Sequence, residues 1–97
     1  MRRKARIDDN QQSVVKSLRQ IPGVSVAVTS SLGNGFPDLV IARSGVNYLV
    51  ELKDGAKSKS RKKLTPDEEE FKNTWQGSYH VAESLEDILR LLEIGSG

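Results

Sequence analysis

The sequence contains no cysteine and only one histidine, His80, among its 97 residues. Without cysteine there is no disulfide framework and no thiolate metal site, and a single histidine cannot supply the nitrogen and sulfur ligands that zinc prefers. No apolar run approaches the roughly 20 residues that a membrane-spanning helix requires. The basic start MRRKAR is not followed by the apolar stretch of a signal peptide. We therefore expect a cytoplasmic protein with no membrane contact.

The length and composition indicate one globular domain. Apolar residues make up 36% of the chain and charged residues 29%, which is typical neither of disordered nor of membrane proteins. A chain of this size supports one modest hydrophobic core. We expect a single domain over residues 1–94, followed by a flexible tail at residues 95–97.

The net charge of +2 conceals two basic clusters. The bases in them are Arg2, Arg3, Lys4 and Arg6 near the start, and Lys57, Lys59, Arg61, Lys62 and Lys63 in the middle of the chain. From Leu64 onward, eight acids face only Lys72 and Arg90. Bases gathered in this way favour a polyanionic partner, for which DNA is the natural candidate. A solvated surface loop would explain the second cluster equally well.

The residue pattern predicts an α/β protein in the order α-β-β-β-α-β-α, with one mixed sheet flanked by helices. Capping residues and Pro22-Gly23 delimit the first helix, and Thr65-Pro66 followed by acids is a strong helix start. Phe71 and Trp75 are expected on the buried face of that later helix. The expected helices cover residues 8–20, 66–75 and 84–94, and the expected strands residues 24–31, 37–43, 47–53 and 78–82.

Two of these strands carry charged residues that a core would exclude. Neighbouring side chains of a strand alternate between faces, so Glu51 and Lys53 point the same way. If the strands are joined by a two-residue turn at Ser44-Gly45, or by a loop of four residues, Asp38 lies directly opposite Glu51. The two carboxylates and the ammonium group then converge at one end of the sheet.

Two like charges facing each other require a compensating cation. Two carboxylates, a main-chain carbonyl such as that of Leu52, and water molecules form the oxygen ligand set that Mg²⁺ or Mn²⁺ prefers. Lys53 beside such an ion would help to deprotonate a water molecule or stabilise charge on a phosphate oxygen. The alternative is structural: Glu51 and Lys53 form an ion pair at a strand edge, and Asp38 ends a turn.

The same residues resemble the motif of the PD-(D/E)xK nuclease superfamily. Pro37-Asp38 is followed, after twelve residues, by Glu51-Leu52-Lys53. With the later segment KLTPDEEEFKNTW, nearly the entire chain resembles the small stand-alone virus-type replication-repair nuclease (VRR-NUC) domains, which are similar to Holliday junction resolvases. The resemblance implies a restriction-endonuclease-like sandwich, encoded by a virus or bacterium and acting inside the host or bacterial cell.

The resemblance also implies an activity and roles for the site residues. It implies a homodimeric endonuclease on branched DNA, with Mg²⁺ or Mn²⁺ held by Asp38, Glu51 and the carbonyl of Leu52, and with Lys53 as catalytic base or charge stabiliser. A two-fold dimer matches the two equivalent strands of a four-way junction. The alternatives are a nuclease that prefers flaps or single strands, and a DNA-binding module that has lost efficient catalysis.

Several further residues have two interpretations each. Gln11 occupies the position where many relatives carry an acid on the first helix, so it is a candidate site residue that offers only a neutral oxygen. Glu68 is nearest to a glutamine found in resolvase-like relatives, but it is equally well explained as an acid at a helix start. Ser31 and Asn34 are candidates to contact DNA phosphate, or ordinary turn residues.

Overall fold

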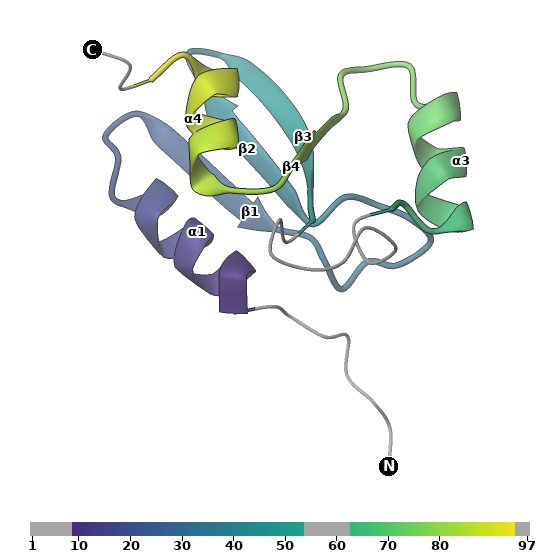
Figure 1. Ribbon diagram of the computed structural model, residues 1–97. Coiled ribbons are helices and arrows are strands. Elements are labelled where there is room, and N and C mark those ends of the chain that lie inside the picture. Colours follow the sequence, from purple (N-terminus) through teal and green to yellow (C-terminus); the bar gives the residue numbers. More distant parts are fainter. Residues whose placement is uncertain (1–8, 54–62, 95–97) are drawn as a thin grey trace.

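The structure is a computed structural model that describes residues 9–53 and 63–94 (Figure 1). Its elements follow one another in the order α-β-β-β-α-β-α, which confirms the predicted α/β class and order. They are α1 (Asp9–Arg19), β1 (Val24–Val28), β2 (Leu39–Arg43), β3 (Val46–Leu52), α3 (Pro66–Thr74), β4 (His80–Ala82) and α4 (Leu85–Leu92). In the described part of the chain, no helix is long and apolar enough to cross a membrane.

The four strands form one mixed sheet in the order β1-β2-β3-β4. Strands β1, β2 and β3 are antiparallel neighbours, and β4 pairs in parallel with β3. The β2–β3 register, from Leu39↔Val50 to Arg43↔Val46, is the one that the two-residue turn predicted. Ser44 and Gly45 both have positive φ, 55° and 79°, as hairpin turns that match the twist of the strands require.

Helices α1 and α4 lie over one face of the sheet (Figure 1). Each presents an apolar stripe at helical spacing, and the sheet contributes the alternate residues of β2 and β3 that point the same way. The side chains at the centre of this core are fully buried. They include Leu18 from α1, Leu39 and Ile41 from β2, Val50 from β3, and Ile88 and Leu92 from α4.

Helix α3 stands beyond the end of the sheet, away from α1 and α4 (Figure 1). It has no buried residue, so the prediction that Phe71 and Trp75 lie on a buried helix face was wrong. The Phe71 ring stacks on Trp75 at 4.9 Å and packs edge-on against Phe36 at 5.3 Å. Trp75 caps the carboxyl end of α3 and remains 41% exposed. The aromatic residues thus form a small half-exposed group of their own, outside the main core.

The loop before β2 and the start of α3 approach each other closely at Gly35. A Cβ atom added to Gly35 would lie 2.2 Å from the carbonyl oxygen of Asp67, whereas one added to Gly33 would meet nothing within 4 Å. Both glycines have positive φ, 81° and 76°. Gly35 therefore allows a backbone contact, as well as a turn, that joins α3 to the loop carrying Pro37 and Asp38.

Gly35→Ala should destabilise the protein more than Gly33→Ala. Both substitutions incur the cost of about 1 kcal/mol or more for a side chain at positive φ, but only Gly35→Ala forces α3 away from the loop. We expect an additional loss of about 2 kcal/mol in the free energy of unfolding, measured by urea denaturation, and a change in the fluorescence of Trp75. Equal losses for the two variants would show that the close approach contributes nothing to stability.

Candidate functional site

Asp38 and the end of β3 meet where the β2–β3 ladder ends. Asp38 directly precedes β2, and its Oδ2 accepts a hydrogen bond of 2.9 Å from the main-chain N–H of Leu52. The N–H and the C=O of one strand residue point to the same side, so the carbonyl of Leu52 is also directed toward the Asp38 side of β3. The structure therefore brings together the carboxylate of Asp38 and the main-chain groups of Leu52, as the sequence predicted for this end of the sheet.

Glu51 lies beside Asp38 and is 3% exposed. Because Val50 and Leu52 point into the core under α1 and α4, alternation directs Glu51 to the opposite face of the sheet. Its Oε1 is buried and has no hydrogen-bond partner within the described residues. Burial, followed by the negative charge of Asp38, raises the pKa of Glu51 to about 9. Burial is also the main cause of the raised pKa of Asp38, to which the charge of Glu68 adds.

The cation of the cluster is Lys53, held between two acids. Its Nζ lies 3.4 Å from Glu51 Oε2 and 2.8 Å from Glu68 Oε1. Burial alone would lower the pKa of Lys53, but the hydrogen bond to Glu68 and the charges of both acids outweigh it, so that the pKa is raised. Lys53 is accordingly charged at neutral pH. We call Asp38, Glu51, Lys53 and Glu68 the acid centre.

Glu68 is placed by the local structure at the start of α3. Thr65 caps the helix, its side chain accepts from Glu68 N, and Glu68 Oε1 accepts from Thr65 N at 2.9 Å. The same oxygen accepts the hydrogen bond from Lys53. Burial would raise the pKa of Glu68, but the hydrogen bonds from Lys53 and Thr65 lower it overall. This capping box fixes a carboxylate at the point where it binds the ammonium group.

The acid centre has groups that suit a divalent cation, although it is not a complete cage. Among residues 9–53 and 63–94, no set of three or more His, Asp and Glu side chains is arranged to hold a metal ion. The candidate ligand set is smaller: the carboxylates of Asp38 and Glu51 and the carbonyl of Leu52. The unpartnered, buried Oε1 of Glu51 is the kind of atom that a cation would satisfy. Such a set leaves several coordination positions for water, as Mg²⁺ commonly does.

Gln11 does not join this centre directly. It is 5% exposed, and its amide donates a hydrogen bond of 3.3 Å to Ser30 Oγ. Within the described residues, no hydrogen bond links it to Asp38 or Glu51. The connection is indirect: Ser30 follows Thr29, whose N–H donates to the carbonyl of Asp38 at 2.7 Å. Gln11 therefore supports the chain segment beside Asp38.

Three of the predicted DNA-contacting residues, Ser31, Asn34 and Lys63, lie in the described part of the chain, and all three are exposed. Asn34 adopts a positive φ of 58°, as a turn residue does. The remaining residues of the two basic clusters lie outside the described residues; they are Arg2, Arg3, Lys4, Arg6, Lys57, Lys59, Arg61 and Lys62.

The structure associates two further residues with the acid centre. Glu68, which the sequence left between two interpretations, is one of them, and the second is Tyr79, whose buried hydroxyl has no hydrogen-bond partner within the described residues. Burial raises the pKa of Tyr79, and the charges of Glu51, Glu68 and Asp38 raise it further. The Thr65-Pro66 helix start predicted Glu68 as an acid in the first turn of the helix, and the structure adds its part in the capping box. Tyr79 carried no signal, because its position depends on the register of β4.

Comparisons with known proteins identify no relative of this chain. No protein-family model matches the sequence, and no curated protein and no solved structure matches it.

The stability of the protein should depend on pH through Glu51. Between its ordinary pKa of 4.5 and its folded value of about 9, the folded protein retains a proton that the unfolded chain has lost. The free energy of unfolding should therefore fall as pH rises across this window. Glu51→Gln cannot titrate and should show a smaller fall, measured by urea denaturation in EDTA. The exposed Glu69→Gln variant is the control, and a wild-type slope in Glu51→Gln would contradict the assignment.

The ion pair between Lys53 and Glu68 should appear as a coupling energy. A double-mutant cycle of Lys53→Met and Glu68→Gln should give about 1 kcal/mol or more, because the two side chains are only 13% and 18% exposed. Glutamine at position 68 keeps an oxygen for the capping box. Pairing Lys53→Met with Glu69→Gln, one residue further along the same helix turn, should be additive within about 0.5 kcal/mol. Additivity in both cycles would rule out a stabilising pair.

Proposed function

We propose that the protein is a metal-dependent DNA endonuclease that hydrolyses phosphodiester bonds, with its active site at the acid centre. The observation that carries the proposal is the buried carboxylate of Glu51 next to Asp38. Within the described residues its Oε1 lacks a hydrogen-bond partner, and burial together with the charge of Asp38 raises its pKa to about 9. A purely structural ion pair would not need the second acid.

Asp38, Glu51 and the carbonyl of Leu52 are the groups that would hold Mg²⁺ or Mn²⁺. A divalent ion bound there would act as a Lewis acid on a phosphate oxygen and lower the pKa of a water molecule. Its positive charge would favour ionised Glu51, so metal binding and loss of the Glu51 proton are coupled. Asp38 is already oriented for this role by the hydrogen bond from Leu52 N.

Lys53 is better suited to charge stabilisation than to general base catalysis. A general base must be neutral before it accepts a proton, and the neighbouring acids raise the pKa of Lys53. As an ammonium group it would stabilise the negative charge that develops on the phosphate oxygens. Its contacts with Glu51 and Glu68 hold it at the site before substrate arrives.

DNA as substrate, the preference for four-way junctions and the homodimer are part of the same proposal, and they derive from the resemblance to VRR-NUC domains. The two basic clusters favour a polyanion. A flap- or single-strand-preferring nuclease is the first alternative, and comparison of junction, flap and duplex cleavage distinguishes it.

A DNA-binding module with weak catalysis is the second alternative, and two observations favour it. Gln11 offers a neutral amide and bonds to Ser30 instead of adding a carboxylate to the acid centre. Lys53 is also engaged by Glu68 through a bond of 2.8 Å, which a substrate phosphate would have to compete with. Such a module would still bind DNA with a steep dependence on salt concentration.

The decisive experiment is cleavage of labelled four-way junction DNA with Mg²⁺ or Mn²⁺. Wild type should cut, whereas Asp38→Asn, Glu51→Gln and Lys53→Met should each lose at least about 100-fold in rate, because the first two remove a carboxylate that would hold the metal and the third removes the charge that would stabilise the phosphate oxygens. Glu69→Gln should retain activity. If the wild type cuts no DNA structure with either metal, the endonuclease proposal fails.

A thermal-shift measurement tests the metal site without relying on activity. Either ion should raise the melting temperature of wild type by binding the folded state. Glu51→Gln and Asp38→Asn should show a much smaller rise. An equal rise in all three proteins would place the metal elsewhere.

A further inference from the structure

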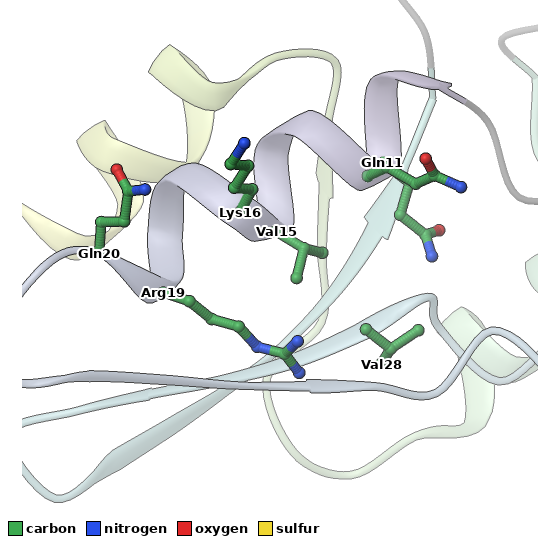
Figure 2. Close-up of a pocket in the computed structure, with 7 residues that line it drawn as sticks. Gln11, Val15, Lys16, Arg19, Gln20 and Val28 are labelled. Atoms are coloured by element: carbon green, nitrogen blue, oxygen red, sulfur yellow. The ribbon is translucent and has the colours of Figure 1, made fainter.

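Two hollows lined by residues that the structure describes differ in character, one beside α1 and one beside α3. The first, of about 530 Å³, lies between α1 and the edge strand β1 (Figure 2), and the α1 hollow is our name for it. The second, of about 310 Å³, lies against α3 and is lined by Asn34, Asp67, Glu70, Phe71 and Thr74. Its lining, as far as the structure describes it, contains two carboxylates and no cation and so repels phosphate groups.

The α1 hollow is lined by hydrogen-bond donors and cations. Lys16 and Arg19 supply positive charge, Gln11 and Gln12 supply amides, and none of the described residues that line it is an acid. Gln12, Lys16 and Arg19 are spaced four and three residues apart, so they share one face of α1. Arg19 donates one hydrogen bond to the carbonyl of Val26 and has further donors. This is the composition that contacts a nucleic-acid backbone.

The floor of the α1 hollow is apolar. The Val15 side chain points from α1 toward β1, and Val28 lies on the strand below it (Figure 2). Val28 is 42% exposed, although its strand partner Leu39 is fully buried. An apolar surface beside donors of this kind can accept the face of a base or sugar while the cations hold the phosphate. The volume is within the range of nucleotide-sized pockets.

The α1 hollow and the acid centre lie at the same end of the sheet. Val28 is the last residue of β1 and pairs with Leu39, the residue after Asp38. Thr29 and Ser30, which follow Val28, connect to the carbonyl of Asp38 and to the amide of Gln11 respectively. Strands β1 and β3 are two strand spacings apart, roughly 10 Å, within the plane of the sheet. Glu51 faces the side of the sheet opposite α1, so a DNA strand that joins the two sites passes from one face to the other around the end of β2.

We propose that the α1 hollow is a binding subsite for the phosphodiester backbone of a DNA strand whose scissile phosphate lies at the acid centre. This inference rests on the proposed nuclease function, and it adds the path that the DNA strand takes across the protein surface from the acid centre. The strand leaves the acid centre past Ser30 and along the cationic face of α1. It avoids the acidic start of α3.

DNA binding by matched variants tests the subsite. Affinities for a fluorescein-labelled 20-nucleotide single strand and a four-way junction are measured by anisotropy in EDTA, so that cleavage plays no part. Lys16→Ala and Val28→Glu should weaken binding by about fivefold to tenfold. The controls are Lys72→Ala on α3 and Val46→Glu at the start of β3, where Val46 is 48% exposed. Both should stay within about twofold of wild type, and Lys16→Ala should lower the salt slope by about 1.

A second measurement examines the hollow by itself. Titration with thymidine 5′-monophosphate should shift the methyl NMR signals of Val15 and Val28 in wild type, and much less in Lys16→Ala. The subsite is refuted if Lys16→Ala and Val28→Glu bind DNA as their controls do, or if the nucleotide leaves these methyl signals unchanged.

The two proposals fail in different ways. If wild type binds DNA through Lys16 but cuts nothing with either metal, the subsite stands and the endonuclease proposal fails. If wild type cuts DNA and neither Lys16→Ala nor Val28→Glu differs from its control, the endonuclease proposal stands and the subsite fails.

Discussion

The buried carboxylate of Glu51, placed beside the half-buried carboxylate of Asp38, is the constraint on which the arrangement of this protein depends. Without a bound cation, Glu51 is held protonated, with a pKa of about 9, and the one ammonium group of the cluster, Lys53, is shared with Glu68. Because Glu68 belongs to α3, the ion pair that it forms with Lys53 also fixes the position of α3 relative to the sheet. The hairpin, the loop before Asp38 and α3 are therefore held together by these charges, by the close backbone approach at Gly35 and by the packing of Phe36 against Phe71, with the hydrophobic core on the opposite face.

The parts of the fold that follow from local chemistry were predictable from the sequence. The turn at Ser44-Gly45 fixes an even-length loop, strand alternation then places Asp38 and Glu51 together, and the observed register has this form. The Thr65-Pro66 start of α3 likewise follows from capping preferences. These features need only residues that are close in sequence or paired through a short turn. The proximity of Asp38, Glu51 and Lys53 depends on the same short-range relations, which is why strand alternation and the even-length turn predicted it.

The parts that depend on long-range packing were not predictable in this way. The spacing of Phe71 and Trp75 predicted a buried helix face, but periodicity does not indicate what a helix packs against, and α3 faces an aromatic group of its own with no buried residue. The involvement of Glu68 and Tyr79 with the acid centre required the position of α3 and the parallel register of β4, which joins strands far apart in sequence. Gln11 illustrates the converse: its position in the sequence suggested the metal site, but its amide is directed to Ser30.

The hydrogen bond from Arg19 to the carbonyl of Val26 also bears on how copies of this chain can associate. Strand β1 is an edge of the sheet, and an exposed edge invites another strand to add to it. The guanidinium group occupies one of the acceptors that an added strand would need, at the middle residue of a five-residue strand. Continuing the sheet across β1 into a second molecule would require Arg19 to give up this bond. While this bond is in place, Arg19 hinders the addition of a strand at this edge.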